Sequence, residues 1–213
     1  MQTTDKRIVV LVSGGGTNLQ AILDAQARGE IKNGRVSAVI SSNDTAYALE
    51  RAKKAGVPGY VIKKKDYPSG EVYCKELAAF LQEKDIGLVV LAGFMTVLDA
   101  YFCKTFENRI INVHPSLIPS FCGDGFYGLH VHEAALAKGV KVTGATVHFV
   151  NPVTDGGPII AQKAVYVEPG DTPEMLQKRV MAQAEHILLP HVVSLFCEGK
   201  LSVSEDGIVS ISE

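Results

Sequence analysis

Short apolar runs alternate with amphipathic segments through the first half of the chain. The run RIVVLVS at 7–13 lacks polar alternation, which is typical of a strand buried on both faces of a parallel sheet. Similar runs predict further strands, and apolar residues spaced three and four apart predict the intervening helices. The predicted strands are 7–13, 36–42, 60–62, 87–92 and 109–113, and the predicted helices are 17–28, 46–55 and 71–84. This alternation favours a doubly wound, mostly parallel α/β sheet with right-handed crossovers.

Longer apolar segments follow in the second half of the chain. A short helix is predicted at 131–138, and two longer strands are predicted at 142–150 and 158–167. We expect these two strands to pair antiparallel, so that the parallel sheet continues into an antiparallel C-terminal part.

A long helix is predicted at 173–195, with Thr172 as its N-cap and Pro173 at its first position. Pro190 is expected to bend or break this helix, because proline lacks the N–H that a helix interior needs. An Asp-Gly pair between two short apolar runs then predicts a hairpin at 201–213.

Composition and charge narrow the class of protein. With 46% apolar and 21% charged residues the chain is typical of a globular protein, and without a repeat or linker we expect one domain over 1–213. A net charge of -2 provides no basic field for nucleic acid, so an anionic ligand must be held locally. The four cysteines form no CxxC spacing, and no apolar run approaches the ~18–20 residues of a membrane helix. We expect a cytoplasmic protein, monomeric or homodimeric, that binds small molecules and neither nucleic acid nor membranes.

The stretch SGGGTN at 13–18 stands between the first predicted strand and the first predicted helix. Glycines there let a ligand approach the backbone, and the free amides of a helix N-terminus favour an anion. A dinucleotide fingerprint would need a third glycine where Leu19 stands, and the Gly-Lys pair of a P-loop is absent. A monophosphate site therefore fits better than a dinucleotide or triphosphate site. A tight turn that serves only packing is the alternative.

Two polar side chains end the predicted strand 109–113, in the segment INVHPSL. Pro115 disfavours helical backbone at His114, so His114 and Asn112 lie two apart on an extended strand and point to one face. At the carboxyl edge of a parallel sheet they would share the ligand crevice with the glycine loop. A His can transfer a proton near neutral pH, and an Asn amide can donate to an oxyanion. This pair suits attack on a carbonyl; the alternative is a locally bonded His and an Asn that closes a turn.

Several other ionisable residues allow both a functional and a structural interpretation. Asp155, in TDGGP, would orient the histidine of that pair and favour its imidazolium form, or would simply form an Asp-Gly turn. His130 and His132 lack a convincing third ligand, so no metal site is predicted. His148 is expected to be a packed or hydrogen-bonded strand residue. Glu185 is by default solvated, but at a pocket rim it would receive a cationic amine.

Taken together, several segments resemble the glycinamide ribonucleotide formyltransferases of the folate-dependent formyltransferase family. The match covers about residues 7–200 and includes SGGGTNLQAI, LAGFMTVL, INVHPSLIPSF, GATVHFV, DGGPII and AEHILLP in this order. The Asn-x-His-Pro-Ser-Leu segment with a later Asp-Gly-Gly-Pro is specific to the wider group, and the SGGGTN loop picks out this member. Methionyl-tRNA formyltransferase and formyltetrahydrofolate deformylase carry added domains for which 213 residues leave little room.

The resemblance implies a reaction and its site residues. A formyl group would pass from 10-formyltetrahydrofolate to the amine of glycinamide ribonucleotide in de novo purine (IMP) biosynthesis, by direct attack with no acyl-enzyme and no metal. Thr96 and Gly70 stand where members often carry Arg near the folate. By resemblance, the catalytic residues are Asn112, His114 and Asp155, the ribonucleotide would contact Gly16, Thr17, Asn18 and Glu185, and the folate would contact Met95, Thr96, Val97, Leu98, Asn112, Asn151, Pro152, Val153, Thr154 and Asp155.

In the implied mechanism, Asn112 and a protonated His114 stabilise charge on the formyl oxygen, and Asp155 keeps His114 protonated. The glycine-rich stretch 120–130 is expected to form a flexible lid close to the site. Two other functions stay open: a nucleotide- or sugar-phosphate-binding module without chemistry, and a hydrolase that releases formate.

Overall fold

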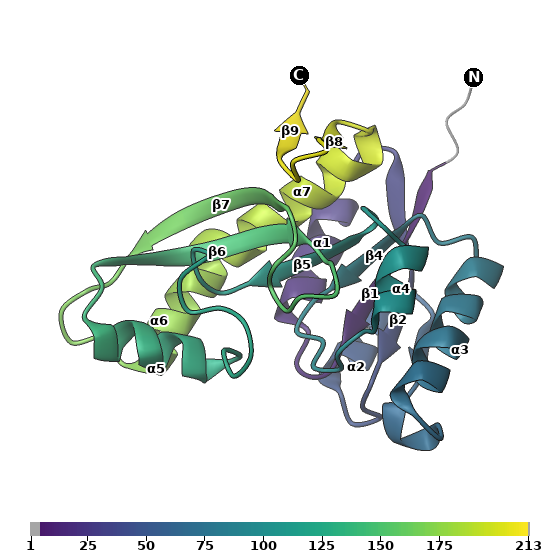
Figure 1. The fold of residues 1–213 in the computed structure, drawn as a ribbon, viewed down its shortest axis with the longest axis horizontal. Coiled ribbons are helices and arrows are strands. Elements are labelled where there is room, and N and C mark those ends of the chain that lie inside the picture. The colour runs from purple at the N-terminus through teal and green to yellow at the C-terminus, as the bar shows by residue number, and fades with distance from the viewer. Residues whose placement is uncertain (1–4, 213) are drawn as a thin grey trace.

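One twisted sheet organises residues 5–212, which are the residues that the computed structural model describes (Figure 1). Its strands lie in the order β3-β2-β1-β4-β5-β6-β7; the first five are parallel, and β6 and β7 are antiparallel to their neighbours. The strands are β1 (Lys6–Val12), β2 (Gly34–Ser41), β3 (Gly59–Val61), β4 (Leu88–Leu91), β5 (Ile110–His114), β6 (Val142–Phe149) and β7 (Ile159–Tyr166). The predicted doubly wound sheet with an antiparallel C-terminal part is confirmed.

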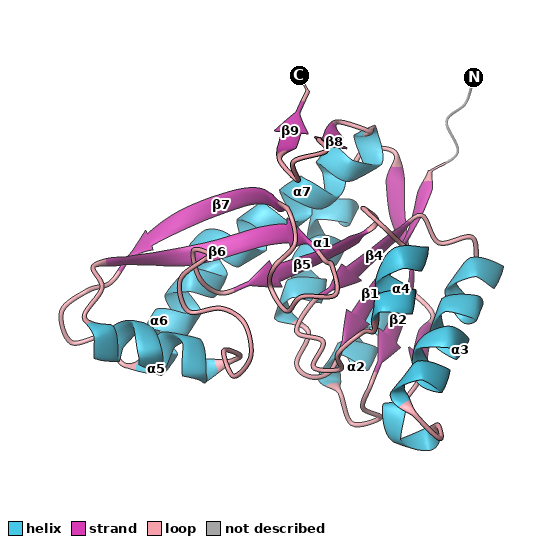
Figure 2. Ribbon diagram, viewed as in Figure 1, coloured by secondary structure: helices cyan, strands magenta, loops and turns pink. Residues whose placement is uncertain are grey.

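Helices connect the strands and cover both faces of the sheet (Figure 2). They are α1 (Thr17–Ala27), α2 (Tyr47–Lys54), a 3-10 turn η1 (Lys64–Asp66), α3 (Gly70–Glu83), α4 (Ala100–Thr105), α5 (Leu129–Lys138), α6 (Pro173–Val180), a π-helical turn η2 (Met181–Glu185) and α7 (His186–Glu198). The predicted helices are present with small shifts at their ends. Helix α4 was not predicted, because its 6 residues are too few to show a period. The strands β8 (Leu201–Val203) and β9 (Val209–Ile211) pair as a separate hairpin.

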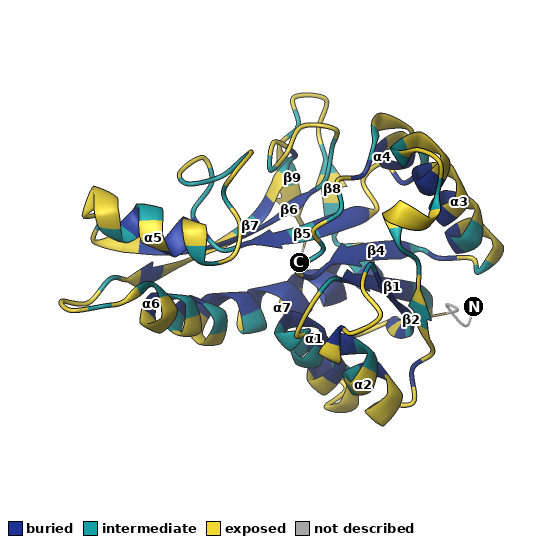
Figure 3. Cartoon of the chain, turned by 90° about the horizontal axis from the view of Figure 1, so that it is seen from below, coloured by how far each residue is buried: buried dark blue, intermediate teal, exposed yellow. Residues whose placement is uncertain are grey.

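The hydrophobic core lies on both faces of the sheet, because successive residues of a strand point in opposite directions. Ile8, Val10 and Val12 of β1 pack with residues of α1, α2 and α7, whereas Val9 and Leu11 pack with residues of α3 and α4. Figure 3 shows the central strands as a buried layer between these groups of helices. A strand covered on both sides needs apolar residues at every position, which explains the unbroken apolar run of β1.

The late helical run is continuous from Pro173 to Glu198 but changes its winding at η2. At its start, Thr172 Oγ1 accepts the Met175 N–H at 3.3 Å, as expected for the predicted cap. Of the predicted bend or break at Pro190, the break is wrong, because α7 continues through this residue, and the bend stays a prediction. The π turn η2 lies just before the helical turn that the proline ring would crowd.

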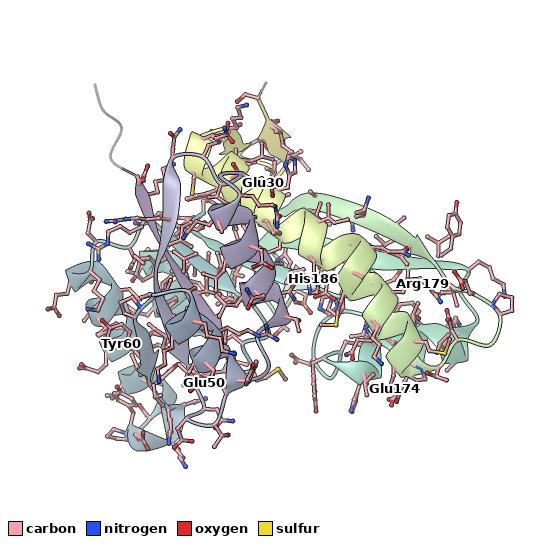
Figure 4. All side chains as sticks on the ribbon, turned by 180° about the vertical axis from the view of Figure 1, so that it is seen from behind. Glu30, Glu50, Tyr60, Glu174, Arg179 and His186 are labelled. Atoms are coloured by element: carbon pink, nitrogen blue, oxygen red, sulfur yellow. The ribbon has the colours of Figure 1, made fainter. Side chains whose placement is uncertain are left out.

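This helical run is a core element of the protein. By length and composition alone it would pass for a membrane span, but 61% of its most apolar window is buried inside the fold. Figure 4 shows Glu174, Arg179 and His186 along its length. Near its beginning, the Arg179 guanidinium donates to the Asp171 carboxylate at 2.6 Å and to the Tyr166 carbonyl at 3.2 Å, which ties the helix to the end of β7.

The strand order determines where a ligand can bind. Chain order reverses between β1 and β4, so the loops after these strands diverge and leave a crevice at their carboxyl ends. The glycine loop follows β1, residues 92–99 follow β4, and β5 ends beside them at His114. The first two loops are joined by hydrogen bonds from the Ser13 N–H to the Gly93 carbonyl at 3.1 Å and from the Met95 N–H to Ser13 Oγ at 2.9 Å.

Candidate active site

Two cavities lie at the carboxyl edge of the parallel strands. The first has a volume of about 590 Å³ and the second a volume of about 300 Å³. Four residues at the end of β5 and in the flanking loops line both cavities: Gly93, Val113, Pro115 and Gly128. Molecules bound in the two cavities would therefore meet at the end of β5.

Asn112, His114 and Asp155 all line the first cavity, although Asp155 comes from the loop between β6 and β7. His114 Nδ1 lies 3.4 Å from Asp155 Oδ2, and these side chains are 5% and 9% exposed. The same carboxylate accepts the Gly123 N–H at 2.9 Å. Asp155 also forms the expected turn, with a left-handed φ of 53°, so the turn itself aims a buried carboxylate at the imidazole; the catalytic role of Asp155 stays a prediction.

His148 joins this cluster from the neighbouring strand. The antiparallel register of β5 and β6 places it opposite Asn112, with His148 Nε2 3.2 Å from Asn112 Nδ2 and 3.6 Å from Asp155 Oδ1. His148 Nδ1 lies 2.8 Å from the Phe149 carbonyl oxygen, which can only accept, so Nδ1 carries the proton. His148 Nε2 then accepts from the Asn112 amide, which orients Asn112 and leaves its second N–H for a ligand.

The charge state of His114 differs from the expectation. Burial lowers the pKa of His114, and although Asp155 and the Phe121 carbonyl raise it, the net pKa lies below the ordinary value. Asp155 favours the imidazolium as expected, but burial outweighs it, so the ring of the free protein is harder to protonate than the implied mechanism expects. The surroundings nevertheless suit a second proton, because the Phe121 carbonyl oxygen lies 2.8 Å from His114 Nε2 while Asp155 faces Nδ1. The ring is neutral at rest with an acceptor already beside each nitrogen.

Asp155 itself remains ionised. Burial raises the pKa of this carboxyl, but the neighbouring His148 and His114 rings and the Gly123 N–H outweigh it and hold the net pKa below its ordinary value. A carboxylate is therefore present behind His114 throughout the neutral pH range.

The glycines of the loop fall into two groups. Gly16 has a left-handed φ of 72°, and a Cβ there would lie 2.6 Å from Ala48 Cβ, so the fold itself requires this glycine. A Cβ added at Gly14 or Gly15 would meet no atom within 4 Å, and neither residue has a left-handed φ. Among residues 5–212 no packing contact requires glycine at these two positions, and the backbone there is open to approach. Packing alone, the alternative reading of this loop, accounts only for Gly16.

Glu185 lies in the wall of the second cavity, together with Gly16, Thr17 and Asn18. It is only 6% exposed, so the default interpretation of a solvated glutamate is wrong. Burial raises the pKa of Glu185, opposed by a hydrogen bond from Asn18 Nδ2 to Glu185 Oε2 at 2.6 Å. Glu185 is the last residue of the π turn, and such turns often occur at functional sites.

The glycine-rich stretch 120–130 lies against the first cavity, which residues 123–128 help to line. Besides the bond from Gly123 to Asp155, Thr154 Oγ1 donates to Asp124 Oδ1 at 3.1 Å. The stretch is thus tied at two points to the 151–155 loop, and it covers the end of β5 at Phe121. Its expected closeness to the site is observed.

The residues that the resemblance assigns to the folate gather in the first cavity. Three of them expose apolar side chains there: Met95, Val97 and Val153 are 57%, 72% and 65% exposed. Gly70 begins α3 and lines neither cavity as the structure describes them. The assigned residues that line the first cavity are Met95, Thr96, Val97, Leu98, Asn112, Asn151, Pro152, Val153, Thr154 and Asp155.

Comparison with known proteins establishes the family. The sequence matches the family model described as formyl transferase over residues 6–193. The chain belongs to the formyl transferase family. It is 42% identical over 200 residues to the phosphoribosylglycinamide formyltransferase of Escherichia coli (strain K12), covering 94% of this chain and 91% of that protein. The resemblance inferred from the motifs is therefore confirmed.

Solved structures of formyl transferases agree with this assignment. The crystal structure of glycinamide ribonucleotide transformylase 1 from Symbiobacterium toebii has a TM-score of 0.92 and 46% identity, covering 100% of this chain and 96% of that chain. A formyltetrahydrofolate deformylase from Pseudomonas syringae pv. tomato shares the fold at a TM-score of 0.86, but with 25% identity and with 66% of its length covered.

Two histidines near the site of this formyl transferase were not assigned a role from sequence. His148 was expected to be a packed strand residue, because its partner Asn112 lies on another strand and only the β5–β6 register brings them together. His132 was considered only as a metal ligand, and among the described residues no group of three metal-binding side chains is found. It lies instead in the wall of the second cavity.

Proposed function

We propose that this protein transfers the formyl group of 10-formyltetrahydrofolate to the amine of glycinamide ribonucleotide, a step of de novo purine (IMP) biosynthesis. The observation that carries the proposal is the wall that the two cavities share at the end of β5, beside Asn112 and His114. The folate would occupy the larger cavity and the ribonucleotide the smaller one. Similarity to the Escherichia coli phosphoribosylglycinamide formyltransferase over 94% of the chain supports the same reaction.

The chemistry of each cavity suits its substrate. Exposed apolar side chains of Met95, Val97 and Val153 offer a surface that a flat heteroaromatic ring would cover. In the smaller cavity, the open backbone at Gly14 and Gly15 leads into the free amides at the start of α1, which favour a phosphate. The phosphate of the ribonucleotide would bind there.

In the proposed reaction, the amine nitrogen attacks the formyl carbon directly. A carbon–nitrogen bond forms, the formyl oxygen becomes negative, and the bond from the formyl carbon to N10 of the folate then breaks. The proton that leaves the attacking nitrogen ends on N10, carried by His114 or by water. Neither Ser nor Cys is among the described residues that line the cavities, which supports a route without an acyl-enzyme.

The main requirement of this reaction is to stabilise the negative charge that develops on the formyl oxygen. The Asn112 N–H that is left free by His148 would donate to it, and His114 would provide the second interaction. Because burial lowers the pKa of His114, the ring gains a proton readily only when negative charge develops beside it. Asp155, 3.4 Å from Nδ1, then accepts from the imidazolium, while Nε2–H exchanges the Phe121 carbonyl oxygen, 2.8 Å away in the free protein, for the formyl oxygen.

Purified protein supplied with both substrates tests the proposal. We expect equal amounts of formylated ribonucleotide and tetrahydrofolate, with no free formate. Formate without formylated amine would identify a hydrolase, which is the activity printed in the name of the Pseudomonas syringae relative. Phosphate-ligand binding without either product would identify a binding module. Either result would reject the proposed transfer.

A further inference from the structure

His132 is an unusual residue for the wall of a cavity. It is fully buried, at 0% exposure, in the first half of α5 and lines the second cavity. Neither Nδ1 nor Nε2 has a hydrogen-bond partner among the residues that the structure describes. A buried polar group without a partner destabilises the folded state, so two on one ring need an explanation.

A second residue with an unpartnered polar atom lines the same cavity. Asn18 Oδ1 is also buried without a hydrogen bond, while Asn18 Nδ2 donates to Glu185. Three unpartnered polar atoms thus come from two residues that line one cavity. Their common position points to a ligand that supplies the missing hydrogen bonds.

The chemistry of these atoms narrows the class of ligand. Burial, together with the nearby His114, lowers the pKa of His132 to about 4, so the ring is neutral at neutral pH and offers one donor and one acceptor. Asn18 Oδ1 is an acceptor, and Glu185 adds carboxyl oxygens to the same wall. A wall this rich in acceptors repels a phosphate. It suits groups that both donate and accept, such as sugar hydroxyls and carboxamides.

We propose that His132 is a substrate-binding residue that hydrogen-bonds an uncharged hydroxyl or amide group in the ribosyl-glycinamide part of the amine substrate. The inference rests on the proposed function and adds a specificity contact to it. The phosphate stays on the glycine loop, and His132 reads the part of the substrate between the phosphate and the reacting amine. The unpartnered His132 nitrogens destabilise the free protein, and the bound substrate supplies their hydrogen bonds.

The test compares three variants by steady-state kinetics and thermal unfolding. His132→Leu removes both nitrogens at similar volume, and His132→Gln keeps one donor and one acceptor. Thr143→Val is the matched control, because Thr143 Oγ1 is also buried without a partner but lines neither cavity as described.

We expect His132→Leu to raise the KM for glycinamide ribonucleotide roughly tenfold or more, since each lost hydrogen bond weakens binding several-fold. The KM for the folate and inhibition by inorganic phosphate should stay unchanged, and His132→Gln should recover part of the affinity. Because unpartnered atoms are removed, the Tm of His132→Leu should equal or exceed that of the parent, as in Thr143→Val. A merely structural histidine would instead lower the Tm.

A measurement on the unaltered protein covers the case in which a variant does not fold. The imidazole ¹⁵N signals of His132 should shift when glycinamide ribonucleotide is added, and should not shift with inorganic phosphate. An unchanged KM in both His132 variants, or ¹⁵N signals that ignore the ribonucleotide, would overturn the inference while the parent still transfers formyl groups. If the parent protein transfers none, the proposed function fails first, and this inference falls with it.

Discussion

Replacing Asp155 by Asn removes one negative charge from the site and almost nothing else. The two side chains have the same shape, and the Asn oxygen can still accept the Gly123 N–H that Asp155 accepts at 2.9 Å. What is lost is the charge that faces His114 Nδ1 at 3.4 Å, from a side chain only 9% exposed. We expect the variant to fold and to bind both substrates but to turn over slowly.

The size of the loss follows from this geometry. Two unit charges 3.4 Å apart interact by about 5 kcal/mol at an effective dielectric constant of about 20. This interaction exists only when His114 is protonated, so it stabilises the transition state and not the free enzyme. The Asn dipole retains part of it, which leaves an expected loss of about 3–4 kcal/mol, or about 10²–10³-fold in kcat.

The assay measures kcat and both KM values for formyl transfer between pH 5 and 9. The sign of the pH effect is set by Asp155, which raises the pKa of His114 against the larger effect of burial. Without it that pKa falls further, so the decline of kcat with falling pH, which occurs as the resting ring becomes protonated, should move to lower pH. Asp124→Asn is the matched control: Asp124 also lines the first cavity, but it accepts from Thr154 and faces neither imidazole.

Stability provides a separate check on Asp155. Its pKa is lower in the folded protein than the ordinary value of 3.8, so it stabilises the fold above that pH and this contribution is lost as the pH falls through the folded pKa. The Tm deficit of Asp155→Asn should therefore be present at neutral pH and disappear in acid.

A kcat of Asp155→Asn within threefold of the parent, or an equal loss of kcat in Asp124→Asn, would refute the reasoning.

Four further variants test other parts of the site. Asn112→Ala should lower kcat by about 10²–10³-fold, the usual effect of removing one oxyanion donor, and a near-normal kcat measured in the folded variant would reject that assignment. Because burial raises the pKa of Glu185, its ionisation costs stability that is absent in acid, grows as the pH rises above the ordinary value of 4.5, and is complete above the raised pKa. Glu185→Gln should therefore raise the Tm at pH 8 but not at pH 4, and equal shifts at both pH values would contradict this. Gly16→Ala should destabilise the protein by about 2–4 kcal/mol in denaturant unfolding, because of its left-handed backbone and the contact with Ala48. Gly15→Ala should leave unfolding unchanged but raise the KM for the ribonucleotide, and a stability loss there would show that packing explains both glycines.

The fold could be predicted because its signals are local. Strands covered on both faces must be apolar throughout, as the run in β1 is, and their alternation with amphipathic helices leaves few topologies. The predictions failed where a signal was too short or where a single residue was expected to break an element. Helix α4 has only 6 residues, and α7 continues through Pro190, with the π turn η2 just before it.

Local sequence signals predicted only part of the candidate site. Asn112 and His114 lie two apart on one strand that Pro115 keeps extended, so their common direction follows from backbone geometry. Asp155 was assigned by resemblance, because no local rule places a loop after β6 against the end of β5. The role of His148 depends on a register that pairs it with Asn112.

By itself, the sequence determined the class of fold, the carboxyl edge where ligands bind, and the residues that carry the resemblance to a family, because periodicity and motif spacing are written along one chain. Only the tertiary structure decided which charges are present at that edge. Burial neutralises His114 and His132 and raises the pKa of Glu185, while Asp155 stays ionised among its donors. Desolvation depends on everything packed around a group, and most of those atoms come from residues far away in the chain.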